Sequence, residues 1–194
     1  MSGRPKIFDN EEVISKATEI FWEKGYEATS TEDLLSAMGI GKGSFYLAFK
    51  GGKRELYEKV VQQFGERAHT RLKMEIRNSK EPLEVVRNFF YEIAQGSKKA
   101  HGNGCFMGNT ITELSAVDHA LAHLATAELQ ALEGIFEDAI RHAQQKGKMK
   151  NKEEAALIAR FLVTAWNGLN ITRRMYPDKK TLQPLIKKYL EVLR

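Results

Sequence analysis

Residues 39 to 56, which read GIGKGSFYLAFKGGKREL, carry side chains whose types and spacing suit contact with DNA. Lys42 can reach a guanine edge or a phosphate, and Gly43 lets another backbone approach closely. Ser44 and Tyr46 supply hydroxyl groups that can bond phosphate oxygens. This pattern predicts the outer face of a short nucleic-acid-binding helix.

Basic residues also gather around this predicted helix. Lys42 is followed by Lys50, Lys53 and Arg54, and no acidic residue lies between Gly39 and Arg54. Clustered cations displace counterions from a duplex and so favour its binding. A solvated basic surface without a partner is the alternative interpretation, but the combination of residues favours DNA.

Cys105, the single cysteine of the chain, offers a different chemistry. It follows Lys98, Lys99 and His101 and is expected to begin a short helix, where free amides and nearby cations favour a thiolate. Such a thiol could respond to oxidants or electrophiles by sulfenic acid formation or alkylation. The alternative is a small buried hydrophobic residue, which the apolar residues after it make plausible.

An enzyme or a metal-binding protein is the rival interpretation for the histidines. Cys105 with His101 could act in nucleophilic catalysis, and His119 with His123 could hold a metal from one helix face. The second pair lacks the glutamate of a zinc-protease motif, and His142 lies about five turns further along the expected helix. We therefore expect ordinary histidines, with no catalytic residue, no metal and no cofactor.

The DNA-contacting residues require a helix-turn-helix to present them. Ser30 is a candidate N-cap with Asp33 three residues later, and a glycine ends the helix that follows. A second helix over residues 42–49 turns Phe45 and Phe49 inward, one turn apart. The glycine-containing connection between the two helices permits the steep crossing that this motif needs.

The stretches GYEATS, GIGKGSFY and KREL stand in the order and spacing of a known family. Over about residues 8 to 60 the chain resembles the N-terminal domain of the TetR/AcrR transcriptional regulators, and GCFMGNTITEL more loosely resembles a C-terminal branch of that family. The resemblance implies a homodimer that binds double-stranded operator DNA, most often as a repressor, and that a small-molecule effector releases. Some members of the family sense oxidants through a cysteine in this region.

The resemblance also implies DNA contacts by seven residues, namely Thr29, Thr31, Lys42, Gly43, Ser44, Tyr46 and Lys53. The threonines would contact phosphates, residues 42–44 would enter the major groove, and the tyrosine and the last lysine would clamp the DNA backbone. Many family members have a histidine or tyrosine at the positions of Leu47 and Ala48. Leu47 could instead meet a thymine methyl.

Composition limits the function classes only weakly. The chain has 194 residues and a formal net charge of +5, yet residues 1–54 hold eight Lys or Arg and eight Asp or Glu, which sum to zero. The local basic patch is therefore a better indication than the total charge. A single cysteine excludes an intrachain disulfide, and the absence of a long apolar run or signal-like start leads us to expect a cytoplasmic protein with no membrane partner.

Helical periodicity continues through the rest of the chain and predicts an all-α fold. We expect a three-helix DNA-binding domain with an N-terminal arm over residues 1–52, and a larger regulatory and dimerisation domain over residues 53–194. Arg4 and Lys6 in the arm could follow a minor groove, or the arm could be a disordered tail. Beyond residue 52 we expect helices from Lys53 into the seventies, from Pro82, from Cys105 to Leu114, from Val117 to Lys146, from Ala155 to Met175 and from Thr181 to Leu193.

The helix over residues 155–175 is apolar on most of its circumference, as a helix is when it packs against its own core and a partner at once. We therefore predict a homodimer through residues 155–175 and 181–193, with Ala165 and Leu190 as interface positions to test. Small residues along the first of these helices would let a second helix approach closely.

An effector pocket is predicted inside the C-terminal domain, where aromatic residues and methionine gather from several helices. Its expected residues are Phe89, Phe90, Ile93, Cys105, Phe106, Met107, Phe136 and Trp166. Ordinary core packing is the alternative for each of them. A structural nucleic-acid-binding protein without an effector is a third interpretation of the whole chain.

Overall fold

The computed structural model describes residues 9–194, and every regular element in that range is helical. The chain therefore has the all-α fold that the sequence predicts. The arm with Arg4 and Lys6 lies outside the described residues. The elements are α1 (Asn10–Lys24), α2 (Thr31–Met38), α3 (Lys42–Ala48), α4 (Gly52–Asn78), α5 (Pro82–Tyr91), the 3-10 turn η1 (Glu92–Gln95), α6 (Lys98–Asn103), α7 (Phe106–Leu114), α8 (His119–Gln145), α9 (Ala155–Met175), α10 (Lys179–Tyr189) and the 3-10 turn η2 (Leu190–Leu193).

The first helices begin and end at short-range signals in the sequence. Asp9 caps α1 by accepting a hydrogen bond from the Glu11 amide, and Ser30 and Asp33 form a reciprocal capping box on α2. Gly39 ends α2 with a φ of 68°, a left-handed conformation that a side chain would strain. The chain turns sharply there, so α3 begins after only two further residues.

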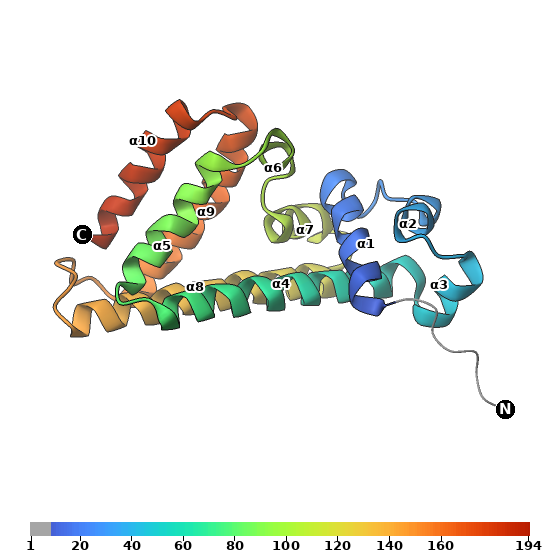
Figure 1. The fold of residues 1–194 in the computed structure, drawn as a ribbon, viewed down its shortest axis with the longest axis horizontal. Helices are drawn as coiled ribbons and strands as arrows, with labels where there is room; N and C mark the ends of the chain where they lie inside the picture. Colours follow the sequence, from blue (N-terminus) through green and yellow to red (C-terminus); the bar gives the residue numbers. More distant parts are fainter. Residues whose placement is uncertain (1–8) are drawn as a thin grey trace.

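Two long helices, α4 and α8, lie side by side along the molecule and connect its two ends (Figure 1). The helices α1, α2 and α3 gather at the beginning of α4. At the other end α5, α9 and α10 form a bundle, and α6 and α7 lie between the two groups (Figure 1). Within residues 9–194, no helix has both the length and the apolar character needed to cross a lipid bilayer.

The apolar core of the N-terminal helices continues past the expected boundary between residues 52 and 53. Phe21 and Phe45 share this core with Tyr57 on α4, Phe106 on α7 and Leu121 on α8. Each fully buried large side chain contributes about 1.5–3 kcal/mol to folding. The helices α1 to α3 are therefore packed directly on elements of the C-terminal half.

A second core holds the C-terminal bundle together. It is built around Phe90, Phe136 and Leu162, and α10 closes it with Leu182 and Ile186, which are fully buried. The first core, at the other end of the molecule, ends near Phe106 and Ala125. Where the two cores approach each other, α7 and α9 leave space for the cavities described below.

Residues 98–103, for which the sequence analysis predicts no helix, form the short helix α6. Ser97 caps it by accepting a hydrogen bond from the Ala100 amide at 3.2 Å, and Gly104 ends it with a φ of 65°. Glycine disfavours a helix by about 1 kcal/mol. Contact with α9 stabilises this one in spite of Gly102.

Two other helices begin at an aspartate that the sequence prediction did not use. α8 begins at His119 and not at Val117, because the carboxylate of Asp118 caps it. α10 begins at Lys179 and not at Thr181, because the Asp178 carboxylate caps it by accepting from a backbone amide at 2.8 Å. Both starts follow the ordinary preference for aspartate at N-caps.

Candidate nucleic-acid interface and adjacent cavities

The helix α3 has a buried aromatic face and an open polar face. Phe45 and Phe49 are buried in the N-terminal core, as their spacing predicts. Lys42 and Tyr46 are exposed, and Leu47 is 80% exposed. The two phenylalanines therefore hold the helix rigidly while its outer face stays free for a partner.

The N-terminus of α3 is suited to receive an anion. Gly41 precedes the helix without a side-chain cap, and the first turn contains no acidic residue. Gly43 has open space where a side chain would stand, so the fold itself does not require glycine there. Unpaired first-turn amides and the positive end of the helix dipole favour a phosphate at this position.

Thr29, to which the resemblance gives a phosphate contact, is turned into the protein. It is 1% exposed, and its hydroxyl donates to the Gly25 carbonyl at 2.5 Å. The expected phosphate contact does not fit this geometry, because the side chain holds the loop between α1 and α2. Thr31 is half-buried at the first position of α2, where backbone amides have no helical partner.

Lys53 supports the same loop from α4. Its ammonium group donates to the carbonyl oxygens of Tyr26 at 3.0 Å and Thr29 at 3.1 Å, and it lies 4.4 Å from the centre of the Tyr26 ring. An ammonium group has three N–H donors, so one remains for a phosphate. Lys53 thus combines a structural role with a position suited to DNA.

The basic patch around α3 is smaller in the structure than in the sequence. Arg54 donates to the Asp118 carboxylate at 2.7 and 3.2 Å, and this hydrogen bond raises the pKa of the guanidinium. The pair joins the start of α4 to the cap of α8. Lys42 and Lys50 remain exposed beside Lys53.

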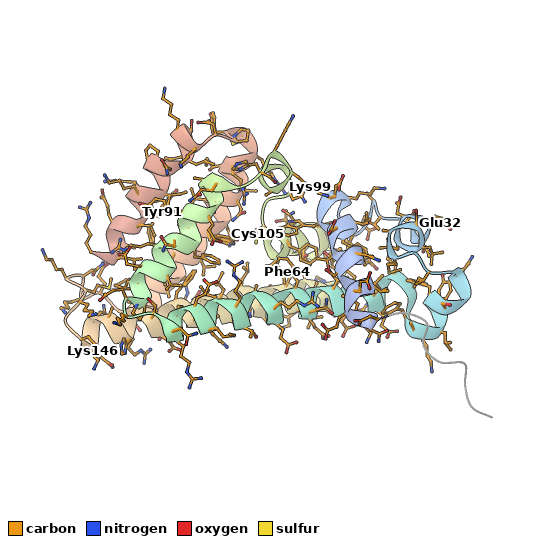
Figure 2. The ribbon with its side chains drawn as sticks, viewed as in Figure 1. Glu32, Phe64, Tyr91, Lys99, Cys105 and Lys146 are labelled. Carbon is orange, nitrogen blue, oxygen red and sulfur yellow. The ribbon has the colours of Figure 1, made fainter. Side chains whose placement is uncertain are left out.

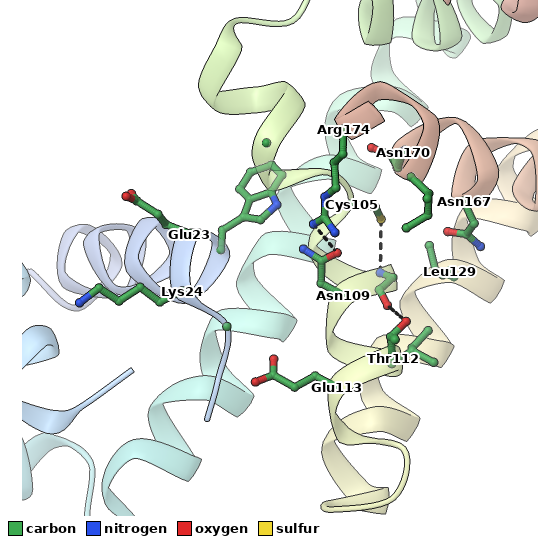
Figure 3. A pocket seen from close by; sticks show the side chains of 16 residues that line it. Glu23, Lys24, Cys105, Asn109, Thr112, Glu113, Leu129, Asn167, Asn170 and Arg174 are labelled. Atoms are coloured by element: carbon green, nitrogen blue, oxygen red, sulfur yellow. Dashed lines mark hydrogen bonds between the residues drawn. The ribbon is translucent and has the colours of Figure 1, made fainter. Parts of the chain in front are cut away.

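Glu113 connects α7 to the DNA-binding helices. Its carboxylate oxygens accept hydrogen bonds from the backbone amides of Tyr26 at 3.0 Å and Glu27 at 2.8 Å. Figure 3 shows Glu113 extending from α7 toward the end of α1. Gly25 has a φ of 85°, and a side chain there would meet the carboxylate. A movement of α7 would therefore displace the loop between α1 and α2.

Two cavities lie behind the DNA-binding helices. We call the first the inner cavity; it has a volume of about 330 Å³ and is lined by Phe89, Cys105, Phe106, Met107 and Trp166 among others. The second, the outer cavity, has a volume of about 520 Å³ and lies beside α1 and the end of α9 (Figure 3). Cys105 lines both cavities, in the middle of the molecule (Figure 2).

Five of the eight residues predicted for an effector pocket line the inner cavity. The other three, Phe90, Ile93 and Phe136, are buried in the C-terminal core and do not line it. The Phe136 ring packs on Phe89 at 5.5 Å and the Phe90 ring on Trp166 at 6.0 Å between centroids. Phe90 and Phe136 therefore pack behind residues of the cavity wall. The expectation that Phe90, Ile93 and Phe136 line the pocket is wrong.

Charged residues line the inner cavity as well, and the sequence analysis did not identify them. His69 and Glu128 approach to 3.3 Å; burial lowers the pKa of His69 and raises the pKa of Glu128. Both shifts favour the neutral forms. Arg173 is 7% exposed, and its guanidinium donates to His101 at 3.2 Å and to Asn170 at 3.3 Å.

The position of Arg173 could have been noticed in the sequence. It follows Trp166 by seven residues, which places both side chains on one face of α9. A cation on the buried face of an apolar helix is uncommon. Sequence periodicity alone does not show that this face meets a cavity, because five other helices also line the cavity.

Cys105 caps α7, as the sequence predicts, but its neighbours differ from the expected ones. Its sulfur accepts hydrogen bonds from the Gly108 amide and from the Trp166 indole, both at 3.4 Å. Lys99, an expected neighbouring cation, is paired with Glu23 at 3.2 Å. The thiol is partly exposed between the two cavities.

The histidines are not arranged for metal binding. His119, His123 and His142 are exposed on α8. In the part of the chain that the structure describes, no three His, Cys, Asp or Glu residues form a cluster that could hold a metal ion. His101 is buried, and its ring accepts the hydrogen bond from Arg173.

An apolar stripe on α9 faces away from the remainder of the chain. Its apolar members are 42–64% exposed, and the stripe consists of Leu157, Phe161, Thr164, Gly168, Ile171 and Met175. These positions alternate spacings of three and four residues, which is the pattern of a helix-packing seam. Ala165 and Leu190, the interface positions chosen from the sequence, are instead buried in the chain's own core, at 3% and 2% exposure.

Comparison with known proteins extends the family resemblance over most of the chain. A family model described as bacterial regulatory proteins of the tetR family matches residues 13–60. A second model, described as the tetracyclin repressor-like C-terminal domain, matches residues 82–189. The second match alone covers more than half of the 194 residues.

Individual relatives agree with these matches. The chain is 28% identical to the uncharacterised HTH-type transcriptional regulator YezE of Bacillus subtilis over 193 residues, 98% of this chain and 99% of YezE. It is 28% identical to the HTH-type transcriptional repressor ComR of Escherichia coli over 174 residues, 89% of this chain and 82% of ComR.

Solved structures share the fold. CifR, a TetR family regulator solved as a cysteine mutant with 26-bp operator DNA, superposes with a TM-score of 0.82 at 22% identity, covering 98% of this chain and 100% of CifR. Reduced E. coli NemR gives a TM-score of 0.83 at 14% identity, covering 95% and 96%. Together with the two family matches, the helix-turn-helix and the C-terminal bundle show that this chain belongs to the TetR family of DNA-binding transcriptional regulators, which are not enzymes.

Proposed function

We propose that the chain is a homodimeric repressor that binds operator DNA through α3 and leaves it when a small molecule occupies the inner cavity. The observation that carries the proposal is the construction of α3, with an exposed polar face fixed to the core by Phe45 and Phe49. ComR is named a transcriptional repressor, and CifR has been solved with operator DNA. Both support the proposal by similarity.

The residues of α3 would divide base and phosphate contacts between them. Lys42, Gly43 and Ser44 open the helix and would enter the major groove, where a lysine can reach guanine. Tyr46 on the exposed face of α3 and Lys53 at the start of α4 would bind phosphates of the DNA backbone. Thr31 would add a phosphate contact, whereas Thr29 would act only by holding the loop.

The apolar stripe on α9 supports a homodimer. Six residues, from Leu157 to Met175, form an exposed seam along that helix. Leu185 on α10 is 39% exposed, and Phe161 packs on the Tyr189 ring at 6.0 Å between centroids, so α10 would complete the interface. A two-fold dimer would set two α3 helices at a fixed spacing on the duplex.

Effector binding would reach the DNA through α7. This helix begins at Cys105 on the inner cavity and ends at Leu114, next to the Glu113 carboxylate that holds the α1–α2 loop. A ligand that moves α7 would therefore change the placement of α3. The ligand must bind one arrangement more tightly, because reversing a 99:1 population needs about 5.5 kcal/mol of preference.

Operator selection tests the proposal. Genomic fragments bound by the protein would be sequenced, and the affinity for a selected fragment would be compared with that for a scrambled one. We expect preferential, salt-dependent binding by a dimer, and release by at least one small molecule from a thermal-shift screen. Equal affinity for both fragments would reject sequence-specific binding through α3.

Oxidant sensing at Cys105 is a second candidate for the signal. Two N–H donors point at its sulfur, and the thiol is partly exposed. In the reaction the thiolate would attack a peroxide oxygen and the O–O bond would break, giving a sulfenic acid and hydroxide, which takes a proton from solvent to become water. We expect peroxide to release DNA from the wild type and not from Cys105→Ser. Equal release from both proteins would remove the thiol from the mechanism.

A further inference from the structure

We propose that the inner cavity binds a small apolar monocarboxylate, whose negative charge pairs with the guanidinium of Arg173. The inference rests on the proposed function, since it names the chemical class of the effector for the cavity described above. It is carried by two buried polar groups of the cavity wall: among residues 9–194, one has no carboxylate partner and the other has no hydrogen-bond partner.

Arg173 is a buried cation without a carboxylate partner among residues 9–194. Its guanidinium has five N–H donors, and its hydrogen bonds go to two neutral groups, the imidazole of His101 and the amide oxygen of Asn170. No carboxylate within residues 9–194 forms an ion pair with it; Glu92 pairs with Arg71, and Glu128 lies against His69. An unpaired buried charge is costly, and burial accordingly lowers the pKa of Arg173.

Trp22 supplies the second group. Its indole nitrogen is buried without a hydrogen-bond partner, and the residue lines the inner cavity together with Arg173. An indole N–H is a donor only. Two side chains of the cavity wall therefore carry an unsatisfied donor and a cation without a carboxylate partner, and both groups call for an acceptor that carries negative charge.

The other residues of the cavity wall indicate the apolar character and the size of the ligand. Phe89, Phe106, Met107 and Trp166 make it apolar and aromatic. The volume of about 330 Å³ lies near the small end of the range for ligand sites, roughly 300–1,000 Å³. The other arginine of the wall, Arg71, is already paired with Glu75 and Glu92, so a monocarboxylate fits better than a dicarboxylate.

Calorimetry on the full chain tests this with three acid and amide pairs: benzoate and benzamide, phenylacetate and phenylacetamide, hexanoate and hexanamide. We expect at least one acid to bind roughly tenfold to a hundredfold more tightly than its amide, the effect of one hydrogen-bonded charge. Arg173→Gln should abolish this preference. Arg174→Gln is the matched control, because Arg174 is exposed and lines only the outer cavity.

Equal affinity of acids and amides, or no binding of any acid, would overturn the proposal, as would an unchanged preference in Arg173→Gln. If circular dichroism shows that this variant does not fold, Trp22→Phe is used instead. It should weaken the binding of the acids at least threefold more than the binding of the amides, and an equal effect on both would overturn the proposal.

Operator binding is measured separately. Acids that bind through Arg173 without releasing DNA would leave the anion site standing and remove its proposed role as effector site.

Discussion

Two threonines near the start of α2 have different roles, and single substitutions can distinguish these roles. Thr29 is buried and bonds Gly25, whereas Thr31 opens α2 at the surface. We expect Thr29→Val to cost about 1 kcal/mol, the value of one hydrogen bond, and to lower the Tm by roughly 2–4 °C. Thr31→Val should keep the Tm and weaken DNA binding. Calorimetric melting and fluorescence anisotropy would check both, and a weaker salt dependence in Thr29→Val would contradict the assignment.

The capping box of α2 should make the stability of the fold depend on pH, and the direction of this dependence follows from the pKa of Asp33. Hydrogen bonds from Lys24 and Ser30 lower the pKa of Asp33 to about 2, from an ordinary value of 3.8. Because the folded pKa lies below the unfolded one, the carboxylate stabilises the fold above 3.8, and this contribution is lost as the pH falls toward 2. The Tm difference between the wild type and Asp33→Asn should therefore shrink over that interval. A difference that stays constant with pH would show that the charge contributes nothing.

At the scale of elements, the contact between α7 and the α1–α2 loop is the link to test. Glu113→Gln removes the charge and places an NH2 group against an N–H donor, so the amides of Tyr26 and Glu27 should exchange with solvent faster. Hydrogen exchange followed by NMR would measure this. The control is Glu23→Gln, which removes an exposed ion pair with Lys99 and should change little. Unchanged exchange at both amides would rule out the carboxylate as the link.

Most helices could be predicted from the sequence because their signals are local. Ser30 with Asp33, Gly39, and the inward pair Phe45 and Phe49 follow from caps and periodicity. The helix α6 could not, because contact with α9 stabilises it against its glycines. Arg173 was missed for a similar reason, since a cavity built from six helices has no local signal.

The two faces of α9 are a second case in which local sequence signals do not predict the packing. The helix is apolar on most of its circumference, so the sequence predicts a partner without showing which face receives it. Ala165 points into the chain's own core, and Phe161 and Ile171 point outward. Only the packing of α8 and α10 decides this, and the variants first suggested by the sequence would have disrupted the core.

For the whole molecule, we expect charges on the outer face of α9 to separate the dimer. Phe161→Glu and Ile171→Glu should give monomers in light scattering with unchanged helical content, because a buried unpaired charge opposes association. Met74→Glu is the matched control, since Met74 on α4 is also an exposed apolar residue, at 57%. Ala165→Glu should instead lose helical content. Dimers that survive both α9 substitutions would exclude this interface.

The affinity for operator DNA as a function of salt concentration is the most direct test of whether α3 binds DNA. Fluorescence anisotropy would measure the affinity for selected and scrambled fragments between about 50 and 200 mM salt. The wild type would be compared with Lys42→Ala, Lys53→Ala and Lys146→Ala. Lys146→Ala is the control, because Lys146 lies at the far end of the molecule (Figure 2). Lys42→Ala should cost about 1–3 kcal/mol and relax base preference, and Lys53→Ala should weaken both fragments alike and lower the salt slope by about one unit. Lys146→Ala should match the wild type. If Lys42→Ala and Lys53→Ala also bind the selected fragment like the wild type, α3 is not the DNA-binding element.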